Sequence, residues 1–241
     1  MIQAERFLAE TVARLPEGSE RARLAGWLQE ARDYNANKKP EAASKIDLRQ
    51  QTYDLLTLVR KPSEQEREVL KRRGIVFLPL ETKSYAQVVS EDPDYFWSGE
   101  GELDYANIRP ELRDYALPVA VEVGFNPTQL ALPDSFRKSR PVQLQMIEGY
   151  SQQLQAEFPD ARVVMLPSTG YAQGDRAYKV ATGEVLFRNY FARALDNLSE
   201  VDAAYAGRLD PSRRFFVHTW FADDGLDFVG AVPAVVFVGN K

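Results

Sequence analysis

The first 74 residues carry apolar side chains at helical spacing. Two sets recur three or four residues apart, namely Phe7, Leu8, Val12 and Leu15, then Leu24, Trp27, Leu28 and Ala31. This spacing predicts two amphipathic helices, because positions three and four residues apart share one helix face. The stretch 35–44 is polar and contains Pro40, so we expect an exposed connection there.

Two more helices are predicted before residue 75. One begins after Asp47 and is expected to bury Tyr53, Leu55, Leu56 and Val59. The next follows Pro62, where Ser63 and Glu66 stand three residues apart. That spacing is typical of a capping box, in which each residue satisfies a free amide of the other. Gly74 predicts the end of this helix, because glycine adopts the left-handed conformation that closes a helix.

From residue 75 the chain changes to short β-branched and aromatic runs separated by Pro, Gly and Asp. The best strand candidates are 75–80, 119–125, 162–166, 214–221 and 232–238. Apolar residues at every fourth position predict a helix over 141–158, which indicates a strand–helix–strand crossover. The segment 168–178 is Gly-rich and polar and is expected to form a loop after a strand, whereas 183–206 is expected to be partly helical.

These elements predict an α+β protein, with a helical N-terminal region followed by a mixed β-sheet body. We expect residues 1–45 to form a helical appendage. Residues 46–241 are expected to form an α+β domain in which the third and fourth helices pack on the mixed sheet. A hydrophobic fraction of 44% supports a folded core.

Composition excludes several kinds of chemistry. The chain has no cysteine, which removes disulfides, thiolate nucleophiles and cysteine-containing metal sites, and it has one histidine, which removes two-histidine zinc sites. No phosphate-binding glycine loop occurs. The acidic residues between Glu91 and Asp104 lack the spacing of a calcium loop, and a solvated surface explains them. We therefore expect no metal and no cofactor.

Charge and hydropathy limit the partners. The net charge of −5 gives no broad attraction to nucleic acid. The basic triplet Lys71, Arg72 and Arg73 is the candidate nucleic-acid-binding patch, although cations at a helix end also complement the helix dipole. Charged residues interrupt the first turns, and the longest apolar run, 231–238, is far shorter than the roughly 20 residues of a membrane span. We expect a cytoplasmic protein without a membrane partner.

The candidate catalytic residues are His218, Glu122, Asp223 and Asp224. His218 shares a strand face with Phe216 and Trp220, and beside Asp223 or Asp224 it would act as a general base. Ser168 or Thr169 would then be the nucleophile. The alternatives are a hydrogen-bonded histidine in a strand and, for Asp223 and Asp224, a hairpin turn preceding Gly225.

Glu122 lies between small residues on one face of its strand. Burial in a pocket would favour its neutral form and suit it to acid–base work, whereas an exposed sheet face explains it as simply. Glu81 and Lys83 have the Glu-x-Lys spacing of metal-dependent nucleases, but the upstream acids lie on predicted helices, so an ordinary strand end is the alternative.

The C-terminal half resembles a group of uncharacterised hypothetical proteins from candidate-phylum bacteria. The similarity is carried by 187–196 (FRNYFARALD), by Trp220 and the acidic residues that follow it, and by 228–237 (FVGAVPAVVF). It covers most of residues 46–238. The resemblance implies a bacterial cytoplasmic origin but no assigned activity and no catalytic residue.

The sequence therefore favours a non-catalytic binding or interaction module. Its expected partner is another protein or a second copy of the chain. One alternative is a small hydrolase that uses His218 and carboxylates. The other is a nucleic-acid-binding protein that uses the N-terminal helices.

Overall fold

The structure is a computed structural model that describes residues 48–97, 114–197 and 202–239. The chain divides between Ile46 and Asp47, and every described element belongs to the second unit. Helices together with one antiparallel sheet and one mixed sheet confirm the predicted α+β class. The two helices predicted before residue 45 lie outside the described residues. No described helix combines the length and apolar character needed to cross a bilayer.

The first sheet has five strands with β9 at its centre. Its strands are β1 (Val59–Arg60), β2 (Val76–Leu80), β3 (Val121–Phe125), β4 (Ala161–Val164) and β9 (Ala234–Val238). β9 pairs antiparallel with β1, β3 and β4, and β2 pairs antiparallel with β3. Because β3 and β4 both oppose β9, they run in the same direction. Helix α7 (Arg140–Gln155) joins them and forms the predicted crossover.

The helices of the first half follow their capping signals. They are α3 (Leu48–Leu56), α4 (Glu64–Arg72) and α5 (Tyr85–Glu91). Ser63 and Glu66 form the predicted capping box on α4, and Gly74 has the left-handed φ of +80°. Val59 was expected on the third helix but lies on β1, because α3 ends at Leu56 and the chain then extends alongside β9.

The second sheet has four strands and corrects the helix expected over 183–206. Its strands are β5 (Tyr190–Asn197), β6 (Asp202–Arg208), β7 (Phe216–Phe221) and β8 (Val229–Gly230), in the order β7-β6-β5-β8. Alanine at every second position explains the difference, because Ala192 and Ala194 belong to the main core whereas Phe191 belongs to a smaller cluster on the other face. High helix propensity is overridden because the side chains of this strand pack into different clusters on its two faces.

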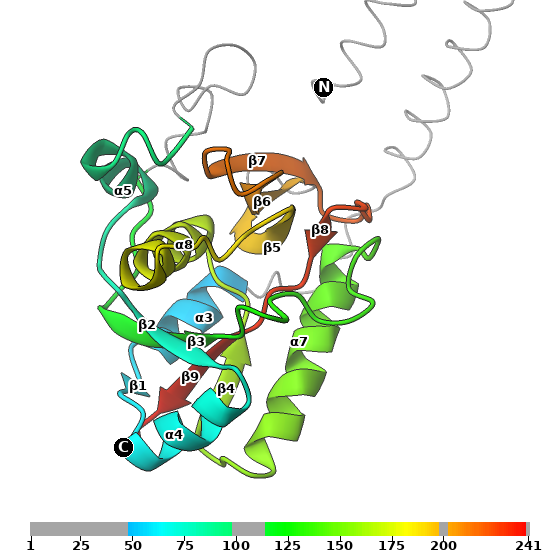
Figure 1. The fold of residues 1–241 in the computed structure, drawn as a ribbon. Helices are drawn as coiled ribbons and strands as arrows, with labels where there is room; N and C mark the ends of the chain where they lie inside the picture. Colours follow the sequence, from blue (N-terminus) through cyan, green and yellow to red (C-terminus); the bar gives the residue numbers. More distant parts are fainter. Residues whose placement is uncertain (1–47, 98–113, 198–201, 240–241) are drawn as a thin grey trace, which may run out of the picture. The chain divides into compact units, whose positions relative to one another are not determined.

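Helix α8 (Ser168–Thr182) corrects the loop expected over 168–178. Its first eight residues are buried, and it contacts both β2 and β6 (Figure 1). A Cβ added at Gly174 would lie 2.9 Å from the Phe125 ring, and one at Gly170 would lie 3.1 Å from Leu166. These glycines therefore allow α8 to approach its neighbours closely rather than marking a loop.

Candidate functional site

The candidate catalytic residues lie on different sheets. Glu122 is on β3 of the first sheet, where it forms an ion pair with Arg67 and lies 4.0 Å from Lys61. His218 is on β7 of the second sheet. The structure therefore places Glu122 among surface cations and does not bring it together with the histidine.

His218 has local contacts within the second sheet. Its ring stacks on Tyr205, with centroids 5.4 Å apart, and its Nδ1 accepts the Thr219 amide at 2.7 Å. The strand register places it on the face predicted from the sequence, with Phe216 and Trp220. Tyr205 lies directly opposite it on β6, and burial raises the pKa of this phenol to about 12.

Asp223 and Asp224 lie in the exposed loop that follows β7. This loop is not the expected hairpin, because the next strand, β8, pairs with β5 and the following one, β9, belongs to the first sheet. The Asp224 carbonyl accepts the buried Arg193 guanidinium at 2.8 Å. Burial, with repulsion from Arg140, lowers the pKa of Arg193 to about 10. The loop is thus anchored by an arginine beneath it.

The two proposed nucleophiles have other partners. The Ser168 amide donates to Asp196 Oδ2 at 2.5 Å, and the Ser168 hydroxyl donates to the same oxygen. The Thr169 hydroxyl donates to the Lys83 carbonyl at 2.9 Å. Both residues lie in the buried first turn of α8. Asp196 therefore caps this helix from β5, because its carboxylate accepts an amide that has no partner within the helix.

The basic triplet lies at the end of α4. Arg73 pairs with Glu157, and the Arg72 side chain donates to the Glu68 carbonyl one turn earlier at 3.3 Å. Lys71, Arg72 and Arg73 are all exposed. Arg72 thus bonds a main-chain carbonyl of its own helix, as cations near a helix C-terminus do, whereas Arg73 pairs with a carboxylate just after α7.

A buried ion pair that no sequence pattern indicated holds α8 to the second sheet. The Asp175 carboxylate pairs with the Arg208 guanidinium, with 0% and 2% of these side chains exposed. Its Oδ2 also accepts the Tyr95 hydroxyl at 2.6 Å, and burial raises the pKa of this phenol so that it stays a donor. Among the described residues, no group of three or more acidic or histidine side chains could hold a metal ion. We assign this pair to structure.

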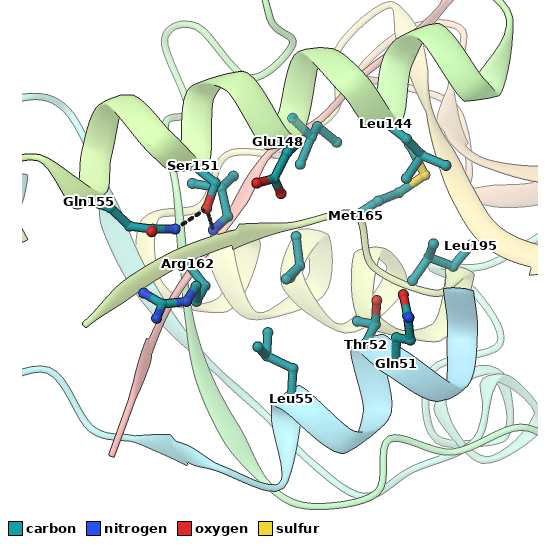
Figure 2. A pocket seen from close by; sticks show the side chains of 13 residues that line it. Gln51, Thr52, Leu55, Leu144, Glu148, Ser151, Gln155, Arg162, Met165 and Leu195 are labelled. Atoms are coloured by element: carbon teal, nitrogen blue, oxygen red, sulfur yellow. Dashed lines mark hydrogen bonds between the residues drawn. The ribbon is translucent and has the colours of Figure 1, made fainter. Parts of the chain in front are cut away.

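A groove of about 400 Å³ runs along β4 between α3 and α7 (Figure 2). Its apolar lining includes Leu55, Leu144, Ile147, Met165 and Leu195. Its polar lining includes Gln51, Thr52, Glu148, Gln155 and Arg162. Mixed walls of this kind, with a few polar groups over an apolar floor, are typical of binding sites. Side chains from α3, α7, β4 and β5 line the groove, so no local motif of the sequence indicated it.

The groove exposes one edge of β4. Among the described strands, β4 pairs with β9 alone. The Val163 amide donates to the Ser151 hydroxyl oxygen of α7 at 3.0 Å, and the Gln155 side chain donates to the same oxygen at 2.9 Å (Figure 2). A side chain thus satisfies an amide that would otherwise be a free edge donor.

The charged side chains of the groove come from its two sides. Figure 2 shows Glu148 extending from α7 and Arg162 on the side of β4 that faces Leu55 of α3. Arg162 donates to the Pro159 and Ala161 carbonyls, both at 2.7 Å. Within the described ranges, no carboxylate forms an ion pair with Arg162. Its guanidinium therefore keeps donors for an anionic group of a ligand.

A second hollow, of about 510 Å³, lies on another face of α7. It is lined by Asn126, Gln129, Ala131, Leu132, Pro133, Met146, Gly149, Tyr150, Gln153 and Pro233. This lining has no charged side chain and no open strand edge, so it offers fewer groups that select a ligand.

No family model, curated protein or solved structure matches the chain. The resemblance to uncharacterised bacterial proteins therefore stays a prediction, and the geometry of the groove is the basis for assigning a function.

Proposed function

We propose that the chain is a non-catalytic binding module that holds a segment of a protein partner in the groove between α3, β4 and α7. The observation that carries the proposal is the open edge of β4 at the base of a hollow with apolar and charged walls. Exposed strand edges bind other chains through main-chain hydrogen bonds. The neighbouring apolar side chains would supply additional buried area.

The placement of the candidate catalytic residues supports a binding role over the hydrolase alternative. Glu122 faces Arg67 on one sheet, and His218 stacks on Tyr205 in the other. General acid–base work requires such groups within hydrogen-bond reach of one substrate. No observation in the described chain favours nucleic acid over a protein segment.

The test is a peptide-library selection against the full chain, followed by affinity measurements on two matched variants. Glu148→Trp places a bulky side chain into the groove, whereas Gln145→Trp places it on an exposed position of α7 outside the groove lining. We expect selected peptides to bind the original chain and the Gln145→Trp variant equally, and the Glu148→Trp variant at least tenfold more weakly. A library without binders, or binders unaffected by Glu148→Trp, would falsify the proposal.

A further inference from the structure

The outer edge of β4 presents two main-chain groups to the groove. In an antiparallel pair, successive residues point their amide and carbonyl alternately toward and away from the partner strand. The Val163 amide donates to Ser151 on α7, so the main-chain groups of Val163 point away from β9. The Val163 carbonyl therefore faces the groove. Met165 is two residues further on, and the same alternation directs its amide to this edge.

These two groups are unsatisfied within the chain as described. No residue of ranges 48–97, 114–197 or 202–239 provides a hydrogen-bond partner for the Val163 carbonyl or the Met165 amide. Both residues line the groove. A main-chain acceptor and a main-chain donor two residues apart are the groups that one residue of an added parallel strand bridges.

We propose that the partner segment binds as an extended strand parallel to β4, with an acidic residue opposite Arg162. This inference rests on the proposed function of the groove. One ligand residue would donate its amide to the Val163 carbonyl and accept the Met165 amide. In an antiparallel strand, the ligand residue opposite Val163 would need both the carbonyl and the amide of Val163, and Ser151 already occupies that amide. The parallel direction is therefore the one in which a single ligand residue forms both of its bonds to this edge.

The parallel register specifies side chains of the ligand. Its bridging residue lies opposite Val164, and the residue two positions earlier lies opposite Arg162 on the same sheet face. Arg162 has no acidic partner among the described residues, so an acidic ligand residue there gains a cross-strand ion pair. The residue after the bridging one lies opposite Met165 on the side of α7, near Leu144. The expected ligand pattern is acidic, any residue, aliphatic, aliphatic.

The probe is the labelled, end-blocked peptide Gly-Thr-Glu-Thr-Val-Leu-Gly, in which Val is the bridging residue. We expect the full chain to bind it and binding to slow hydrogen exchange of the Met165 amide. Replacing the Val amide of the probe by an ester removes the donor to the Val163 carbonyl and should weaken binding roughly fivefold. Lys in place of Glu should weaken binding by a similar factor, and Arg162→Glu should restore affinity for that Lys peptide.

Hydrogen exchange separates the two strand directions. The bridging residue of a parallel strand bonds the Met165 amide, whereas a residue of an antiparallel strand opposite Val163 would bond the Val163 amide, so hydrogen exchange of these two amides reports the direction. The parallel strand is overturned if the probe slows hydrogen exchange of the Val163 amide instead of the Met165 amide. It is also overturned if the ester probe binds as tightly as the amide probe. An equal affinity for the Glu and Lys peptides overturns the acidic preference.

The proposed function and this inference fail in different ways. If library peptides bind through the Glu148 side of the groove but the probe does not bind, the strand register is wrong and the binding role stands. If neither the library nor the probe gives groove-dependent binding, the binding role itself is wrong.

Discussion

Replacing Asp175 by Asn is expected to destabilise the fold more than any surface change. The carboxylate accepts the Leu186 and Phe187 amides at 2.8 and 2.9 Å through Oδ1, and it pairs with Arg208 through Oδ2. Asparagine keeps the size and one acceptor oxygen. It removes the charge that compensates a guanidinium with 2% of its side chain exposed.

The expected loss is about 3 kcal/mol in the free energy of unfolding. Removing one partner of a buried ion pair costs about 3–5 kcal/mol, because the other charge stays buried without compensation. The lower value applies because Arg208 still donates to the Arg213 carbonyl. The double variant Asp175→Asn with Arg208→Met contains no unpaired charge, so its loss should be at least about 1 kcal/mol smaller than the sum of the two single losses.

The assay is urea unfolding at pH 7, followed by far-ultraviolet circular dichroism and by tryptophan fluorescence. The two signals should change together if the domain unfolds in one step. A loss below about 1 kcal/mol for Asp175→Asn would refute the burial argument, as would additivity of the two single changes within about 0.5 kcal/mol.

Two further predictions concern α4 and its end. The Arg60 hydrogen bond lowers the pKa of Glu66 from 4.5 to about 2, so its stabilisation is complete above pH 4.5 and is lost as the pH falls toward 2. Glu66→Gln keeps an amide able to form the capping box and should cost about 1 kcal/mol at pH 7. Urea unfolding should show this difference disappearing near pH 2, and an equal difference at both pH values contradicts it. Gly74→Ala should cost about 1 kcal/mol, because φ is +80° there. An unchanged melting temperature would exclude that strain.

Local signals in the sequence predicted the elements that depend on local chemistry. The capping box of Ser63 and Glu66 was found because both partners lie within one helical turn. The strands near residues 76, 121 and 234 were found because their apolar runs fill the core. The face shared by Phe216, His218 and Trp220 followed from alternation alone.

The elements that were missed depend on contacts between distant segments. Gly170 and Gly174 suggested a loop, but they allow a helix to approach Leu166 and Phe125. Ala192 and Ala194 suggested a helix, but they fill the narrow space on the core face of β5. A sequence pattern does not distinguish a small residue in a loop from one under a close neighbour.

The groove was missed for the same reason. Ser151 stands among the apolar positions of α7, where a small polar residue has no evident purpose until the amide of Val163 is seen beside it. Arg162 fits the alternating pattern of an ordinary strand, so the pattern does not mark it as a residue of a binding site. Only pairing with β9 shows that the other edge of β4 is open.

Helix α8 makes the two sheets thermodynamically dependent on each other. It packs against β2 on one side and β6 on the other, and the main core contains Val123 and Phe125 of the first sheet together with Ala204 and Val217 of the second. Neither sheet retains a complete hydrophobic core when the other sheet is removed. A fragment that ends after Gly183 should therefore fail to fold, and heating the intact domain should give one calorimetric peak.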